Sequence, residues 1–259
     1  IRLGSGEPLL AIDLLRKIHR RIERAGGSEK DGRPYVFLTT NGSLCRPSVR
    51  DWLVSSGWQV KISLDGPADV HDRWRVTKSG RRTFERVAAV VEDLAGRMPA
   101  RLSVAAVLCR GADPDGVFEA IAGLGVRRIE FVPAAHSDAS ILPGAEDAAR
   151  YAEFIDRYAR RMKEKDDPGL PVLVRFENCV QKVMGYGTGG LPCGAGRSYF
   201  GVGPDGGLFP CFRFVGIERF RLGRLPSGLD KTRTSVFVRG AGRRMGRRSS
   251  CRQCEAVGL

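Results

Sequence analysis

Short apolar runs alternate with amphipathic stretches from residue 1 to about residue 165, and this alternation restricts the folds open to the chain. The apolar runs that we predict as strands are Tyr35–Thr40, Gln59–Leu64, Leu102–Leu108 and Arg128–Val132. Apolar residues at helical spacing predict helices over 9–22, 51–54, 83–94, 117–124 and 148–162. Strands that alternate with helices form a parallel sheet joined by right-handed crossovers. The predicted fold class is therefore α/β.

Polar residues follow three of these apolar runs, at the point where each run ends. Gly4–Pro8 follows the start of the chain, Thr39–Leu44 ends the next run, and Ser63–Pro67 ends the one after it. Ligands of parallel α/β folds bind at the carboxyl ends of the strands. We therefore expect these loops to converge on one binding site.

The sequence changes in character near residue 166. Residues 166–192 are expected to form a linker with a short helix. Beyond them, Ser198–Val202 and Leu208–Val215 flank the turn Pro204-Asp205-Gly206, which predicts a β-hairpin. This hairpin would put Cys193 just before one strand and Cys211 within the other.

The chain has 7 cysteines, and the spacing of the last four predicts metal ligation. Twelve residues separate Cys193 from Gly206, four more separate Gly206 from Cys211, and Cys251 and Cys254 form a C-x2-C pair. Nothing indicates secretion, so ligation is favoured over disulfides. Spacing alone fits zinc and iron–sulfur equally well. Cys45 and Cys109 are expected to be ordinary buried or half-buried thiols. Cys179, which lies outside this pattern, is expected to be buried, with a further ligand or a substrate-handling thiol as the alternative.

Composition excludes some classes of protein. The hydrophobic fraction is 42 %, which suffices for a core. No apolar run reaches the roughly 18 residues that a membrane span needs, and we expect a cytoplasmic protein. The net charge of +14 raises nucleic acid as a partner, but the basic residues are mostly dispersed. A nucleic-acid-binding protein stabilised by a structural zinc ion would explain the charge and the C-x2-C pair, but it would not explain the polar residues at the strand ends.

The polar strand ends resemble motifs of the radical S-adenosylmethionine (SAM) enzymes. Gly4–Leu10 is similar to the family's Gly-Gly-Glu-Pro motif, with Ser5 in place of its first glycine, and Thr40–Gly42 is similar to its Thr-Asn-Gly loop. Ile62–Pro67, followed by His71–Arg75, resembles a Ser-Leu-Asp-Gly-Pro … His-Asp-Arg-x-Arg segment. Each motif alone has a plainer interpretation, such as a strand-end serine at Ser63 or a surface-loop histidine at His71. Their order at successive strand ends favours the resemblance.

The resemblance implies a partial parallel (β/α)6-type barrel and a SAM site. In that family the glutamate of the first motif and nearby carbonyls hold the methionine ammonium, which needs acceptors. Ser63 would donate to the SAM carboxylate, Arg75 rather than Arg82 would pair with it, and Val132 would lie beside adenine. The implied SAM-binding residues are Gly6, Glu7, Pro8, Asn41, Ser63, Arg75 and Val132.

The family's C-x3-C-x2-C motif, which binds the 4Fe–4S cluster that chelates SAM, is absent from this sequence. We expect it upstream of Ile1, so that the barrel lacks its first strand and this chain alone does not cleave SAM. The C-terminal cysteines resemble the start of a SPASM region, whose next ligand would follow Leu259. The expected organisation is an incomplete barrel over 1–165, the linker over 166–192, and a truncated SPASM region over 193–259.

The SPASM resemblance implies two auxiliary 4Fe–4S clusters, Cys193 and Cys211 binding the first, Cys251 and Cys254 the second. Pro210–Gly216 looks most like quinohemoprotein amine dehydrogenase maturase and the ranthipeptide maturases, with Phe212 replacing their usual histidine. Anaerobic sulfatase maturases, which form formylglycine, carry an aspartate there as a base. The implied function is therefore radical SAM modification of a peptide or protein, by thioether cross-linking. Expected partners are an acidic, cysteine-containing substrate and an electron donor such as flavodoxin or ferredoxin; nucleic acid is not expected.

Overall fold

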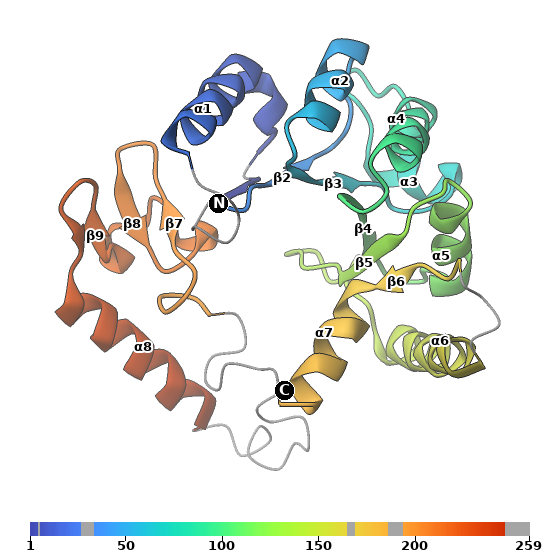
Figure 1. The fold of residues 1–259 in the computed structure, drawn as a ribbon. Coiled ribbons are helices and arrows are strands. Elements are labelled where there is room, and N and C mark those ends of the chain that lie inside the picture. The colour runs from blue at the N-terminus through green and yellow to red at the C-terminus, as the bar shows by residue number, and fades with distance from the viewer. Residues whose placement is uncertain (5, 27–33, 165–168, 186–193, 247–259) are drawn as a thin grey trace. The chain divides into compact units, whose positions relative to one another are not determined.

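The structure, a computed structural model, describes residues 1–4, 6–26, 34–164, 169–185 and 194–246 (Figure 1). The chain forms two compact units, Ile1–Glu177 and Asn178–Leu259, and each is described here by itself. The boundary between them falls inside the segment 166–192 that we predicted as a linker. The predicted three-part division of the chain stays a prediction.

The first unit is built on a sheet of six parallel strands, which confirms the predicted fold class. The strands pair in chain order, so that each neighbour in the sheet is also the next strand of the sequence. Figure 1 shows the helices of this unit on the outer side of the sheet. The strands are β1 (Arg2–Leu3), β2 (Phe37–Thr40), β3 (Gln59–Ser63), β4 (Leu102–Leu108), β5 (Arg128–Pro133) and β6 (Val172–Leu173).

The predicted helices are present, and their starts follow local chemistry. Proline occupies the first turn of a 3-10 helix (Pro8–Ala11), α2 (Pro47–Ser55) and α5 (Pro114–Ala122), where its missing N–H is not needed. Asp113 caps α5 by accepting from Asp115 N. The remaining helices are α1 (Ile12–Ala25), α3 (Ala68–Trp74), α4 (Phe84–Arg97), α6 (Ala145–Glu164) and α7 (Val174–Val183). We did not predict α3 as a helix, because its seven residues carry no apolar period.

The sheet has one apolar face and one mixed face, since neighbouring residues of a strand point to opposite sides. The apolar face packs beneath the helices and includes Leu38, Val60, Ile62, Val104 and Phe131, each at most 1 % exposed. The other face, which lies on the inner side of the curve in Figure 1, is only half-buried. It carries Thr39, Lys61, Ser63, Ser103, Ala105, Val107, Glu130 and Val132.

The second unit contains an antiparallel sheet with the order β10-β9-β8-β7. Its strands are β7 (Gly201–Val202), β8 (Gly207–Phe209), β9 (Gly223–Arg224) and β10 (Gly228–Leu229), and α8 (Lys231–Gly246) follows them. The predicted hairpin is present as β7 and β8, and Gly206 turns between them with a φ of 78° that favours glycine.

The position of Cys211 differs from the prediction, which put it within the second strand of the hairpin. Strand β8 ends at Phe209, and Cys211 lies beyond Pro210, at the start of a 3-10 helix (Phe212–Phe214). Proline has no N–H to donate to a neighbouring strand, so Pro210 ends the ladder. Cys193 lies outside the described residues.

Within the described residues, no helix is both long and apolar enough to cross a membrane.

His71 is fully buried at 0 % exposure, so the surface-loop interpretation of this residue is wrong. Its Nδ1 accepts from Asp65 N at 3.2 Å, and its Nε2 lies 3.1 Å from Thr83 Oγ1. Nδ1 can accept only when it carries no proton, so the neutral ring with a proton on Nε2 fits this site. Burial lowers the pKa of His71, because the charged ring would lose its hydration.

We expect His71 to make folding less stable at acidic pH. Below about pH 6.5 the unfolded chain binds a proton that the buried ring resists, so stability falls as the pH drops towards the lowered folded pKa, by at most about 1.4 kcal/mol per pH unit. In His71→Gln, the difference in unfolding free energy between pH 7.5 and pH 5.5, measured with urea, should shrink. The exposed His136 supplies the control, His136→Gln, which should keep the wild-type difference. An unchanged difference in His71→Gln would contradict the assignment.

Candidate functional site

The first two polar motifs meet at the carboxylate of Glu7. Glu7 Oε1 accepts from Thr40 Oγ1 at 2.7 Å and from Leu9 N at 3.1 Å, and Glu7 Oε2 accepts from Asn41 N at 2.8 Å. One carboxylate therefore caps the 3-10 helix after β1 and holds the loop after β2. These contacts bring together two segments that are more than 30 residues apart in the sequence.

The Asn-Gly pair after β2 has a local structural reason. Asn41 Oδ1 accepts from the backbone N of Ser43 at 2.9 Å and from its hydroxyl at 2.6 Å, which closes a tight turn. Gly42 has a φ of 77°, and a Cβ there would lie 3.2 Å from carbons of both Ile62 and Val87. Glycine is thus required twice at this position, by the backbone conformation and by the space.

The third motif is organised around the buried carboxylate of Asp65, which is 3 % exposed. Arg75 donates to it from Nε at 2.6 Å and from Nη2 at 3.0 Å, and Val107 N donates to Oδ1 at 2.9 Å. The carboxylate thus joins the end of β3 to β4 and to the residue after α3. Arg75 was predicted to pair with the SAM carboxylate. Two of its donors are engaged by Asp65, and its role towards SAM stays a prediction.

Ser63 and Val132 lie on the same half-buried face of the sheet. Ser63 on β3 is paired with Ala105 of β4, and Val132 on β5 is paired with Val107 of β4. The two predicted SAM contacts are therefore separated only by β4, near the carboxyl ends of their strands. The residues on β4 between them, Ala105 and Val107, are small or medium-sized.

Sequence reasoning missed a cluster of charges on the same face. Lys61 Nζ on β3 forms an ion pair with Glu130 Oε2 on β5, and Arg175 Nη2 lies 3.5 Å from Glu130 Oε1. The pair spans β4 at the level of Ser103 and Ala105, whose small side chains permit it. The signal was present in the sequence, because charged residues are rarely placed in the middle of an apolar strand without a partner.

The predicted cluster ligands are almost all outside the described residues. Cys193, Cys251 and Cys254 are among the residues that the structure does not describe, and Cys211 is half-buried. In the part of the chain that is described, no three His, Cys, Asp or Glu side chains gather as a metal site would require. The assignment of these four cysteines to two auxiliary clusters stays a prediction.

The other cysteines are not arranged as ligands. Cys45 is buried, and burial raises the pKa of its thiol to about 12. Cys109 is half-buried, and its pKa is raised first by burial and then by Asp65. Both fit the expected ordinary thiols. Cys179 was expected to be buried, and this was wrong: it is exposed on α7, a helix with no fully buried residue.

Comparison with known proteins gives the fold. No protein-family model matches the chain. A serine-type anaerobic sulfatase-maturating enzyme of Klebsiella aerogenes is 24 % identical over 195 residues, which are 73 % of this chain and 47 % of that protein. The structure of anSMEcpe with bound AdoMet, which is SAM, superposes with a TM-score of 0.77 at 19 % identity and covers 98 % of this chain and 71 % of that one.

The chain therefore shares the fold of anSMEcpe. Streptococcus suis SuiB bound to the precursor peptide SuiA also matches, with a TM-score of 0.59 at 14 % identity, over 100 % of this chain and 59 % of that chain. The chain thus spans about half the length of the Klebsiella enzyme. These likenesses establish the architecture, and the activity is argued separately below.

The described residues fit SAM as a ligand. A carboxylate has about four acceptor positions, and three donors occupy Glu7, so one position remains for an ammonium. The half-buried face beside it offers the hydroxyl of Ser63 and small residues on β4. A charged, polar ligand needs such a face, because apolar packing would leave its groups without hydrogen bonds.

Glu7→Gln should weaken both the loop junction and SAM binding. The amide has one acceptor oxygen and places an NH2 group against a backbone donor, either Asn41 N or Leu9 N, so we expect a loss of about 1–3 kcal/mol in unfolding free energy. SAM affinity, measured by calorimetry, should fall at least tenfold. Glu92→Gln, at an exposed position in the middle of α4, is the control and should change neither quantity. Wild-type SAM affinity in Glu7→Gln would remove Glu7 from the site.

The Lys61–Glu130 pair should show strong coupling in a double-mutant cycle. Glu130→Leu leaves Lys61 and Arg175 without their carboxylate, so it should cost about 1–2 kcal/mol of stability, less than a fully buried pair because the Lys61 side chain is 33 % and the Arg175 side chain 51 % exposed. Adding Lys61→Met should recover about 1–1.5 kcal/mol of the summed losses. The exposed pair Arg157–Asp115 is the matched control, and its cycle should give below about 1 kcal/mol. Equal coupling in the two cycles would show that the inner-face pair is an ordinary surface pair.

Proposed function

We propose that the protein is a radical SAM maturase that modifies a peptide or protein after translation, by forming thioether cross-links. The observation that carries the proposal is the meeting of the strand-end motifs in a unit that shares its fold with anSMEcpe. Glu7 joins the first two motifs, and Asp65 organises the third at the end of the neighbouring strand.

A peptide substrate is supported by what the structural neighbours hold. One anSMEcpe structure contains AdoMet and the Cp18Cys peptide, with a TM-score of 0.75 at 17 % identity over 98 % of this chain and 72 % of that chain. SuiB was solved with its precursor peptide. The half-buried polar face of the sheet in this chain suits such a substrate, because a peptide backbone needs hydrogen-bonding groups wherever it is enclosed.

The residues of this chain would bind and orient SAM. Glu7 accepts from the methionine ammonium, Ser63 donates to the carboxylate, and Val132 packs beside adenine. When bound beside a reduced 4Fe–4S cluster, SAM would supply the radical chemistry that removes a carbon-bound hydrogen from the substrate. The protein contributes placement and exclusion of water, while the cofactor supplies the reactivity.

Two further parts of the proposal concern iron and electrons. Cys193, Cys211, Cys251 and Cys254 would hold two auxiliary 4Fe–4S clusters, and a donor such as flavodoxin or ferredoxin would supply the electron. Thiolates are the usual protein ligands of such clusters.

Formylglycine formation is the second candidate, favoured by the likeness to sulfatase-maturating enzymes. The residue after Cys211 argues against it. Those enzymes resemble this segment but carry an aspartate there as a base, whereas Phe212 is a hydrocarbon side chain that cannot accept a proton. Phe212 is 50 % exposed, so its ring is not retained as part of a packed core.

The test is anaerobic turnover with SAM and a reductant. The protein, expressed with any sequence that precedes Ile1 in its gene, is incubated with cysteine-containing peptides encoded beside that gene. We expect 5′-deoxyadenosine and a peptide lighter by two hydrogens per cross-link, located by tandem mass spectrometry. Glu7→Gln should lower both products together.

Two other outcomes would contradict the proposal. A product in which cysteine or serine has become formylglycine would establish the second candidate instead. A folded, iron-loaded protein that binds SAM and yields no 5′-deoxyadenosine with reductant would remove the radical mechanism altogether.

A further inference from the structure

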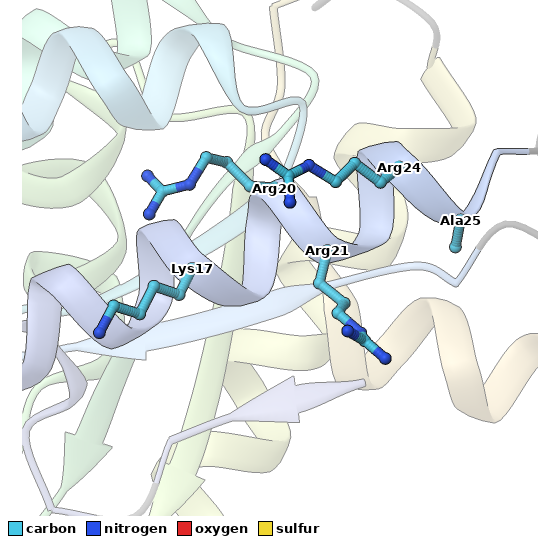
Figure 2. Close-up of a pocket in the computed structure, with 5 residues that line it drawn as sticks. All are labelled: Lys17, Arg20, Arg21, Arg24 and Ala25. Carbon is cyan, nitrogen blue, oxygen red and sulfur yellow. The ribbon is translucent and has the colours of Figure 1, made fainter.

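Helix α1 carries basic side chains on the side opposite to its core contacts. Ile12, Leu15, Ile18 and Ile22 pack against the core of the first unit. Lys17, Arg20, Arg21 and Arg24 are all exposed and, with Ala25, line a hollow of about 500 Å³. Figure 2 shows Arg20 and Arg24 along one edge of the helix, and Lys17 and Arg21 along the other. We call these four residues the α1 basic rows.

The α1 basic rows lack partners within the described residues. No hydrogen bond or ion pair joins any of the four side chains to a described carboxylate. Like charges at i,i+4 destabilise a helix by about 0.2–0.5 kcal/mol per pair, and each row is one such pair. The arrangement is therefore slightly unfavourable for the isolated helix, although cations near its carboxyl end offset part of this cost.

Arginines on the other helices of this unit are arranged differently. Arg50 lies 3.2 Å from Asp93, Arg97 lies 2.8 Å from Asp51, and Arg161 lies 2.7 Å from Glu119. Each of these three guanidinium groups thus faces a carboxylate, which the four side chains of the α1 basic rows do not within the described part of the chain. Against this background, four neighbouring cations around one hollow form a site that attracts an anion.

We propose that the α1 basic rows bind an acidic segment of the peptide substrate in an extended conformation. This inference rests on the proposed function, in that it takes the substrate to be a peptide. It adds the place where the peptide is recognised and the charge pattern that is recognised there.

Helix and strand geometry set the pattern of the segment. Residues four apart on a helix are about 6 Å apart along its axis. Alternate residues of an extended chain are about 6.6 Å apart and point to the same side. An extended segment that lies along α1 between the rows would therefore face one row with its first and third residues, and the other row with its second and fourth. Four consecutive Asp or Glu residues match all four cations.

The test compares two fluorescein-labelled peptides of 12 residues and equal composition. One has four consecutive acidic residues, and the other has the same four residues spaced evenly among Gly and Ser. Binding to the 259-residue chain is followed by fluorescence anisotropy at low salt, which needs neither SAM nor iron. We expect the contiguous peptide to bind at least fivefold more tightly, and this preference to vanish near 1 M salt, where the Debye length is about 3 Å.

Matched variants distinguish the effect of the α1 basic rows on peptide binding from the effect of the overall charge. Arg20→Gln with Arg24→Gln should reduce binding of the contiguous peptide at least fivefold. Arg86→Gln with Arg160→Gln removes the same charge from exposed positions on α4 and α6 and should leave binding within twofold. Gln is nearly as good a helix former as Arg, and circular dichroism checks that each variant is folded. If a variant unfolds, the comparison of the two peptides on the wild-type protein still decides the matter.

Three results would overturn the proposal. Equal binding of the two peptides, or equal losses in the two double variants, would show that only the net charge attracts anions. Tighter binding of a 12-nucleotide single-stranded DNA than of the contiguous peptide, lost in the α1 variant, would assign the rows to nucleic acid instead. Failure of the peptide to bind leaves the SAM chemistry untouched, because that activity is measured separately as 5′-deoxyadenosine.

Discussion

The buried carboxylate of Asp65 is the interaction on which the candidate site depends. It accepts from two nitrogens of Arg75 and from the backbone of Val107, while the backbone N of Asp65 donates to His71. A buried carboxylate is costly unless its oxygens are hydrogen-bonded, and here three donors serve them. The same contacts fix the end of β3, the following α3 and the carboxyl end of β4. Ser63 lies two residues before Asp65, so the contacts of Asp65 also fix the position of Ser63.

The two faces of the sheet have different roles, since the outer face stabilises the fold and the inner face carries the polar groups. The outer face is apolar except for the buried Thr40, and it packs beneath the helices, where each apolar side chain contributes by its burial. The inner face carries hydroxyls, small residues and the Lys61–Glu130 pair. The pair is only half-buried, so it contributes less to stability than the apolar face does. We therefore expect the inner face, beside the loops joined by Glu7, to serve ligand binding more than folding.

The sequence predicted those features that depend on local patterns. The alternating elements, the hairpin around Gly206 and the order of the strand-end motifs all follow from period, turn residues and spacing. The burial of His71 and the pairing of Arg75 with Asp65 could not be predicted, because each depends on residues brought together by the tertiary fold, whereas the charges on β3 and β5 were visible as charged residues within apolar strands although their partners were not. The predicted position of Cys211 was wrong because the hairpin pattern was extended past Pro210, which ends the strand. The predicted burial of Cys179 was wrong because cysteine, although usually buried, is exposed here.

The small residues of β4 make the effects of substitutions at positions 61, 105 and 130 depend on one another, although these positions are distant in the sequence. Lys61 and Glu130 can meet only because Ser103 and Ala105 leave space between them. A bulky side chain at position 105 would separate the charges, and it would be tolerated only in a background where both had already been replaced. These sites are therefore epistatic, and the order of substitution matters during divergence. A mutational library that varies one position at a time would record each site as invariant and would miss the apolar triple combinations that the sheet could accept.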